Sequence, residues 1–277
     1  MNRVIDKIIE ESTDIFSIPE IYSLLRRKLQ DPYASNAEIA DIIKRDPGLS
    51  LTILKIVNSA LYGFKSSISS VAQAVSIIGR LELSELVLST VVVQNFNQLP
   101  IEKTRLHHHW KHCFLCALIA KKLAKQCSLH EISESIFIAG LLHDTGKLMI
   151  YHKFPELVER ALNSDIFQSL QIETDILGFN HAELGSELMK AWDLPLLLQS
   201  TTLWHHSPES AIEYIDACKV INISNVLAHF EAIDEEIESS LNKETCWKTL
   251  NLDIDILFEI HSHAIEELNE TIGAFLK

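Results

Sequence analysis

The sequence predicts an all-α protein. The chain of 277 residues holds only 8 glycines and 7 prolines, and scarce helix breakers favour long helices over short strands joined by tight turns. Apolar residues make up 47% and charged residues 22% of the chain, which is enough to bury a core and unlike a disordered composition. Apolar side chains recur at helical spacing along most of the chain. The valines at 91–93 would suit a strand, but no second β-type run lies nearby to pair with them.

The first hundred residues are expected to form a series of short helices. Residues 1–17 are amphipathic, and a second helix begins at Pro19. Ser35 and Glu38 have the spacing of a capping box, in which each side chain satisfies the other's backbone N–H. That helix is expected to end at Asp46, and Ser69 or Ser70 begins a later one that ends at Gly79. Further helices are expected from about 49 to 62 and from 81 to 96.

The segment at 97–100 is the best internal break. Helices are expected to follow it at about 103–127, 133–143, 155–163, 166–176, 181–192, 195–204 and 211–230, with a final pair after 242. The sequence therefore divides into residues 1–100, residues 101–230 and an acidic C-terminal stretch at 231–277.

Charge excludes several classes of partner. The formal net charge is −14, whereas a nucleic-acid or anionic membrane surface calls for a basic patch. No apolar run reaches the roughly 18–20 residues that span a bilayer, and no signal peptide is visible. Five cysteines, an odd number without framework spacing, suit a reducing cytoplasm. We therefore expect a cytoplasmic protein without a nucleic-acid or membrane partner.

Histidines are abundant, with 13 in the chain, and most lie after residue 105. His112 falls on the apolar stripe of its helix, where a buried imidazole needs a partner; by itself it is more often a hydrogen-bonded core residue. His143 and Asp144 follow an apolar helix in the segment 140–147. Lys147 lies on the same side of that segment, where a cation suits a phosphate-like ligand. A polar helix terminus is the alternative interpretation of this segment.

Three further histidines complete the pattern. His181 follows Asn180 at the start of a helix, and His205 and His206 lie at the end of another, where paired histidines also favour the negative pole of the helix dipole. By contrast, we interpret His107–His109 as a solvated helix start that could bind adventitious nickel. His261 and His263 are expected to face solvent in the acidic C-terminal helix, and Cys113 and Cys116 are interpreted as core cysteines.

Taken together, these residues resemble the HD superfamily of metal-dependent phosphohydrolases. The order is a histidine, a His-Asp pair 31 residues later, another histidine, a His-His pair and a last acidic ligand. Imidazole and carboxylate ligands suit Fe, Mn, Zn, Co or Ni, and a bridging aspartate suits two ions. The resemblance implies a metal site formed by His112, His143, Asp144, His181, His205, His206 and Asn225. Asn225 is the departure, because the superfamily usually has an aspartate there; weaker metal retention and lost hydrolysis are expected from the missing charge.

The segments at 18–32, 38–63, 67–89, 110–124, 138–148 and 181–195 closely resemble the HDOD domain, over about residues 15–230. This resemblance implies a helical N-terminal subdomain packed on an HD-type helical bundle. It also implies a signalling or regulatory protein with protein partners, in which the metal site is partly retained. The alternative is a phosphohydrolase acting on a nucleotide or another phosphoester, with Asp144 and Lys147 as catalytic residues. The enzymatic relatives that hydrolyse cyclic dinucleotides carry a Gly-Tyr-Pro signature. No Gly-Tyr-Pro follows His206 in this chain, so cyclic-dinucleotide hydrolysis is not expected. The seven candidate ligands are compatible with one bound metal ion, with two ions or with an empty site.

Overall fold

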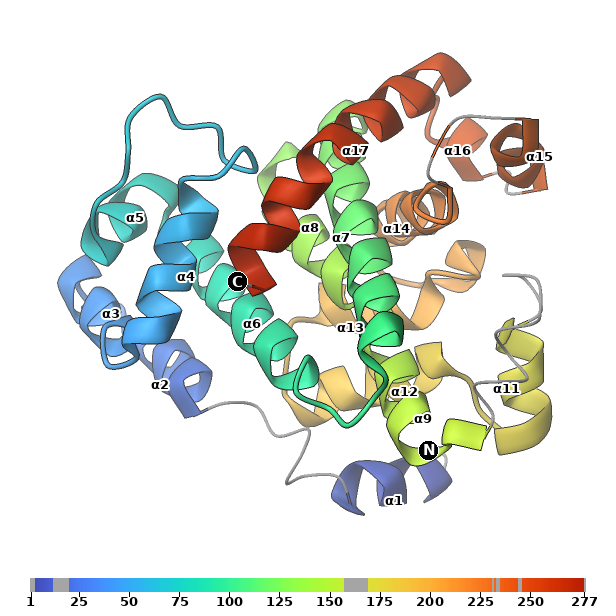
Figure 1. Ribbon diagram of the computed structural model, residues 1–277, viewed down its shortest axis with the longest axis horizontal. Coiled ribbons are helices and arrows are strands. Elements are labelled where there is room, and N and C mark those ends of the chain that lie inside the picture. Colours follow the sequence, from blue (N-terminus) through green and yellow to red (C-terminus); the bar gives the residue numbers. More distant parts are fainter. Residues whose placement is uncertain are drawn as a thin grey trace. The chain divides into compact units, whose positions relative to one another are not determined.

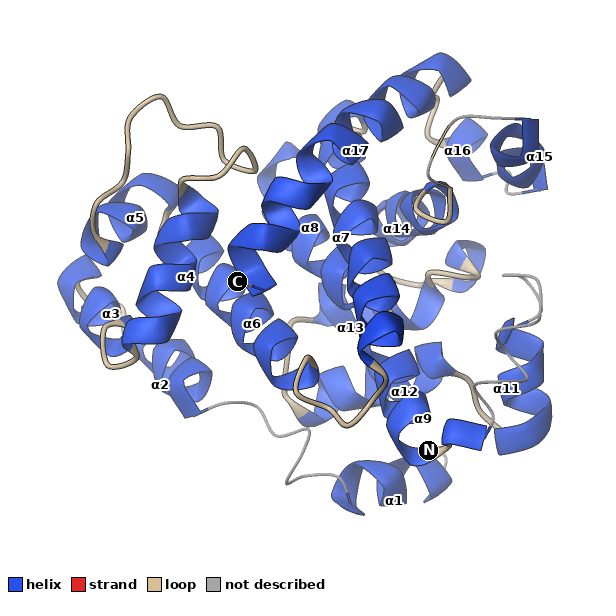
Figure 2. Ribbon diagram, in the orientation of Figure 1, coloured by secondary structure: helices blue, strands red, loops and turns tan. Residues whose placement is uncertain are grey.

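The computed structural model describes residues 3–11, 20–156, 169–230, 232, 235–243 and 246–276. Within these ranges the chain forms helices joined by turns and loops, and no strand occurs (Figure 2). The prediction of an all-α fold is confirmed. The valines at 91–93 are buried inside a helix, because no neighbouring strand competes for their backbone groups.

The described chain forms two compact units. One unit holds the first helix together with the described residues from Leu99 to Ser262, and the other holds those between Ile18 and Gln98 together with the C-terminal residues from His263. This grouping differs from the three stretches expected from the sequence. The N-terminal helix joins the histidine-rich stretch, and the C-terminal helix contributes to both units.

The unit that begins at Ile18 has short helices up to Gln98 (Figure 1). They are α2 (Glu20–Leu29), α3 (Asn36–Ile43), α4 (Pro47–Val57), α5 (Val71–Ile78) and α6 (Arg80–Phe96). The expected capping box is present, since the hydroxyl of Ser35 accepts the N–H of Glu38 and Glu38 returns a carboxylate to the N–H of Ser35. At α4 and α5 the N-cap side chains of Asp46 and Ser70 accept the N–H of Leu49 and Gln73, respectively. Local hydrogen bonds thus fix where these helices begin. The predicted helix start at Pro19 lies outside the described residues.

The histidine-bearing unit is built around a long helix, α7 (Lys103–Gln126). The α-helices of this unit are α1 (Arg3–Glu11), α7, α8 (Ser133–Leu142), α9 (Thr145–Lys153), α11 (Ser169–Leu177), α12 (His181–Ala191), α13 (Leu196–Trp204), α14 (Ile215–Leu227), α15 (Glu235–Lys243), α16 (Cys246–Thr249) and the first part of α17 (Ile254–Leu276). Helices α8 and α14 both pack against α7, and α12 packs against α9 and α13. The expected helix at 155–163 falls largely outside the described residues.

Glycine allows α7 and α8 to approach closely. A Cβ atom on Gly140 of α8 would lie 2.8 Å from the Cα atom of Ala117 in α7, closer than real Cβ contacts allow. Cys113 and Cys116 are buried on α7 with free thiols, so the interpretation as core cysteines is confirmed. The close packing brings the middle of α7 to the end of α8, where the His-Asp pair lies.

Two histidines lie where the sequence did not place them. His109 is buried one turn before Cys113, and its ring packs edge-on against Trp110. His261 is buried, and its Nε2 atom lies 2.9 Å from the carbonyl oxygen of Phe230. Both expectations of solvent exposure were wrong because the polar neighbours of these histidines masked an apolar stripe. In α17 that stripe runs through Leu257, Ile260, His261, Ala264 and Leu268. In the described part of the chain, no helix combines the length and apolar character needed to span a membrane.

Candidate metal centre

His143 and Asp144 lie at a break between two helices. Helix α8 ends at Leu142 and α9 begins at Thr145, so the pair forms the junction. Both side chains are buried, with exposed fractions of 0% and 1%. A fully buried carboxylate requires opposite charge or hydrogen-bond donors around it, and the surroundings of Asp144 provide both.

The two carboxylate oxygens of Asp144 face two different sets of histidines. Oδ1 lies 3.3 Å from Nε2 of His181 and 3.6 Å from Nε2 of His205. Oδ2 lies 3.5 Å from Nε2 of His143 and 3.8 Å from Nε2 of His112. Asp144 therefore stands between the two sets with one oxygen toward each.

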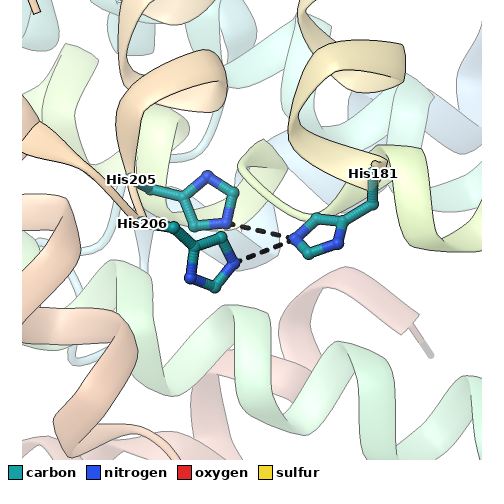
Figure 3. A group of neighbouring side chains, drawn as sticks. All are labelled: His181, His205 and His206. Carbon is teal, nitrogen blue, oxygen red and sulfur yellow. Dashed lines mark hydrogen bonds between the residues drawn. The ribbon is translucent and has the colours of Figure 1, made fainter. Parts of the chain in front are cut away.

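The first set, called the His206 group here, consists of His181, His205 and His206. Figure 3 shows the three rings converging from the start of α12 and the end of α13. Nε2 of His181 lies 3.0 Å from Nε2 of His206 and 3.3 Å from Nε2 of His205. These ligand atoms lie close enough together to hold one ion.

The second set, called the His143 group here, consists of His112, His143 and Asp144, whose ligand atoms also converge on one point. Asn225 of α14 adds an oxygen, since its Oδ1 atom lies 3.0 Å from Nε2 of His112. The structure thus brings all seven residues expected at a metal site together at two neighbouring points. Lys147 lies at the same place, with Nζ 2.7 Å from Oδ2 of Asp144.

Hydrogen bonds on the far side of the rings fix their orientation. Nδ1 of His143 lies 2.7 Å from the carbonyl oxygen of Gly140, and Nδ1 of His205 lies 2.7 Å from that of Thr202. A carbonyl oxygen only accepts, so these Nδ1 atoms carry the proton and Nε2 presents a lone pair toward Asp144. Such outer partners are typical of metal-binding histidines.

Glu173 of α11 holds His181 in the same way. One of its oxygens, Oε2, accepts hydrogen bonds from both Nδ1–H and the backbone N–H of His181, each at 2.7 Å. Asn180 caps the helix that His181 begins, with a complete capping box to Glu183. The His181 ring is therefore fixed by its helix start and by a buried carboxylate.

Two glycines let α9 and α12 approach closely enough for this arrangement. A Cβ atom on Gly146 would overlap the carbonyl oxygen of His181 and would lie 2.9 Å from the backbone nitrogen of Gly185. A Cβ atom on Gly185 would lie 3.3 Å from the backbone nitrogen of Gly146 in α9 and 2.9 Å from Cγ2 of Thr202 in α13. The backbone of the His181 turn packs directly on the start of α9, which places its ring beside Asp144.

Burial and charge set the protonation states of these groups. Burial lowers the pKa of His112 to about 3 and the pKa of His143 to about 4, so both rings are neutral at pH 7. Burial alone would raise the pKa of Asp144, but His143 and Lys147 hold it well below its usual value. Burial also lowers the pKa of His181, and the Glu173 carboxylate more than offsets this, so that pKa is raised. The centre thus holds an ionised carboxylate among imidazoles.

The donor atoms fit a divalent metal ion. Nε2 of His143 and Oδ1 of Asp144 are buried and have no hydrogen-bond partner among the described residues. In the His206 group, the Nε2 atoms of His205 and His206 both lie within 3.3 Å of Nε2 of His181, so one cation could bind all three rings through these atoms. When two nitrogen atoms bind the same metal ion at about 2.1 Å, they lie about 3.0–3.4 Å from one another. The Nε2–Nε2 separations of 3.0 and 3.3 Å in the His206 group fall within this range.

Two further residues, Glu173 and His229, contact the centre and were not expected from the sequence. Glu173 lies eight positions before His181 in an ordinary amphipathic helix, so nothing in the local sequence marks it. The ring of His229 packs against that of His112, with ring centroids 4.4 Å apart and the planes tilted by 37°. It lies four positions after Asn225, one helical turn further on, and this spacing could have indicated it.

The family model of the HDOD domain matches residues 15–208. The chain is 26% identical to the solved structure of an HDOD domain protein from Geobacter sulfurreducens, with a TM-score of 0.75 and 94% and 93% of the two chains covered. It is 22% identical to a Shewanella amazonensis protein named "Putative phosphohydrolase", with a TM-score of 0.75 and coverage of 95% and 97%. A Marinobacter aquaeolei protein named "Putative signal transduction protein" has a TM-score of 0.69 at 17% identity, over 97% and 61% of the chains.

A curated relative from Treponema pallidum is 25% identical over 241 residues, which make up 84% of this chain and 46% of the relative. The chain therefore spans about half the length of that protein. The family model covers most of the chain, and a structure of the same family matches nearly all of it in fold. The chain belongs to the HDOD domain family.

Proposed function

We propose that this chain is a metal-binding regulatory protein of the HDOD family, in which Asp144 bridges two divalent ions. One observation carries the proposal. The two oxygens of the Asp144 carboxylate face two separate groups of ligand atoms, and Oδ1 of Asp144 and Nε2 of His143 are buried without a hydrogen-bond partner among the described residues. Buried imidazole nitrogens and carboxylate oxygens are normally hydrogen-bonded, so these two unpaired atoms at one place favour a bound cation.

The origin of the ligands supports a regulatory role. They come from α7, the α8–α9 junction, α12, α13 and α14, so ions bound here would link five parts of one unit. Metal binding then favours the arrangement in which these helices converge, and the metal-free chain is free to relax from it. A signalling protein that binds only one of these two states would respond to whether metal is bound. We propose a protein partner of this kind.

Phosphoester hydrolysis is the second candidate function. Lys147 favours it, because an ammonium group beside the bridging carboxylate is placed to pair with a phosphoryl oxygen. Bound divalent ions would supply a water of lowered pKa and would polarise the phosphoryl group. A nucleotide or another phosphoester is the ligand class that this arrangement suits.

Metal analysis and a phosphoester panel test both candidates. The purified chain, loaded with Mn²⁺, Fe²⁺ or Zn²⁺ and then desalted, should retain bound ion, whereas Asp144→Asn should lose most of it because both groups lose their shared anion. The regulatory proposal expects ion binding without turnover of phosphomonoesters, phosphodiesters or nucleotides. Turnover by the loaded chain that Asp144→Asn abolishes would establish the second candidate, and a chain that binds no ion would contradict both.

A further inference from the structure

The two halves of the metal centre differ in charge. The His206 group has three imidazoles and the Oδ1 side of Asp144. The His143 group has two imidazoles, the Oδ2 side of the same carboxylate and the neutral amide of Asn225. Asp144 is thus the one anion among these seven ligand residues, and two dications would share it. Affinity for a divalent ion rises with the number of charged ligands, so two equally tight sites are not expected.

Lys147 makes the two halves still less alike. Its ammonium group contacts Oδ2 of Asp144 at 2.7 Å, which is the oxygen that faces the His143 group. An ion bound there would share this oxygen with a cation and would lie close to it. Among the described residues, none donates a hydrogen bond to Oδ1, which faces the His206 group.

Glu173 favours the opposite half. Its buried carboxylate contacts the ring of His181, a member of the His206 group, at 2.7 Å. This outer carboxylate brings a second negative charge next to the His206 group and increases the basicity of the His181 ring. In the His143 group, no carboxylate among the described residues contacts the Nδ1 atoms of the two rings. Nδ1 of His143 contacts the carbonyl oxygen of Gly140, and Nδ1 of His112 contacts that of Ala228.

We infer that this chain holds one divalent ion tightly in the His206 group and a second, exchangeable ion in the His143 group, where Lys147 and Asn225 weaken binding. This inference rests on the proposed function and deepens it. The occupancy of the weak site would follow the free metal concentration, whereas the tight ion would remain bound. The part of the centre that responds to conditions is therefore the one at His112, His143 and Asn225.

Titration of the metal-free chain with Co²⁺ tests the inference. Equilibrium dialysis counts the bound ions, and visible absorption reports their coordination. We expect two steps, with the second at least about tenfold weaker than the first. His206→Ala should remove the tight step, and His143→Ala should leave one tight ion bound while the weak step disappears.

Two substitutions should strengthen the second step alone. Asn225→Asp adds the missing carboxylate and should tighten the second step at least about tenfold. Lys147→Met removes the competing cation and should tighten it as well. Gln126→Glu is the matched control, since it converts an amide to a carboxylate on the helix that carries His112, about 21 Å along that helix. It should leave both steps unchanged.

The outcomes separate this inference from the proposed function. Two steps of equal affinity, or a second step that neither Asn225→Asp nor Lys147→Met tightens, would overturn the inference while the metal-binding function stands. Loss of the tight step in His143→Ala, with the tight step kept in His206→Ala, would assign the sites in the reverse order and would also overturn it. A chain that binds no Co²⁺ would overturn both. Circular dichroism of each variant shows that the helices are retained.

Discussion

Glu173 illustrates how a single residue outside the ligand set can control the centre. Its carboxylate accepts both the side-chain and the backbone N–H of His181 and is itself buried, with 7% of its surface exposed. Removing such an outer partner typically costs about 10–100-fold in metal affinity. Because His181 belongs to the His206 group, the effect should fall on the tight ion.

Glu173→Gln is therefore expected to weaken the first Co²⁺ step about 10–100-fold without changing the helical content. Asp175→Asn provides the control. It removes the same charge from an exposed position two residues further along α11, and it should leave the affinity unchanged. Equal effects of the two variants would show that general charge, rather than the contact with His181, sets the affinity.

At the same scale, the identities of the candidate ligands could be predicted from the sequence. His143 and Asp144 are adjacent, and the later histidines follow in a recognisable order. The hydrogen-bond partners that orient these rings could not be predicted. They are backbone carbonyl oxygens, such as that of Gly140, and the carboxylate of Glu173. These partners are chosen by backbone geometry and by the packing of α11, and neither leaves a mark in the residue pattern.

Among the helices, the contact between α9 and α12 decides whether the centre forms. Gly146 has no room for a side chain, because a Cβ atom there would overlap the carbonyl oxygen of His181. Gly146→Ala should therefore lower the free energy of unfolding by about 3 kcal/mol or more and should displace the His181 ring. Urea unfolding measures the first effect, and Co²⁺ titration measures the second.

Gly48→Ala is the matched control for this change. Gly48 lies in the first turn of α4, where a Cβ atom would meet only the carboxylate of Asp46 at 3.3 Å. Its free energy of unfolding should stay within about 1 kcal/mol of the wild-type value. A Gly146→Ala variant that is as stable as Gly48→Ala and binds Co²⁺ normally would contradict the proposed role of this close contact.

Two capping boxes allow local helix stability to be separated from metal binding. Asn180 caps α12, which begins at His181, and Ser35 caps α3 in the other unit. Asn180→Ala and Ser35→Ala should each destabilise the chain by about 1 kcal/mol. Only Asn180→Ala should weaken Co²⁺ binding, because it loosens the turn that carries a ligand. A loss of affinity in Ser35→Ala as well would indicate that general stability, not the position of His181, controls binding.

For the whole molecule, a bound metal ion should stabilise the histidine-bearing unit against unfolding. An ion that binds the folded chain alone adds about 2.7 kcal/mol of stability at a free concentration 100 times its Kd. Addition of Co²⁺ should therefore raise the urea midpoint of the wild-type chain, and a chelator should reverse the shift. Asp144→Asn should show little response to either. An equal response in this variant would place the stabilising ion elsewhere.

The sequence by itself determined the helical class, many helix boundaries and the candidate ligands, because helix periodicity, capping boxes and spacing along the chain are local properties. It did not predict α9, which begins directly after Asp144. It placed His109 and His261 wrongly, since the side on which a histidine lies depends on what packs against its helix. Only the tertiary structure decided that α7, α12, α13 and α14 bring their ligands to the two sides of Asp144. It also decided that Lys147 and Asn225 both lie beside the His143 group, whereas Glu173 contacts the His206 group. Those are through-space relations between distant segments, and they depend on close helix contacts at Gly140 and Gly146. Through these contacts, histidines that are far apart in the sequence converge on one candidate metal centre.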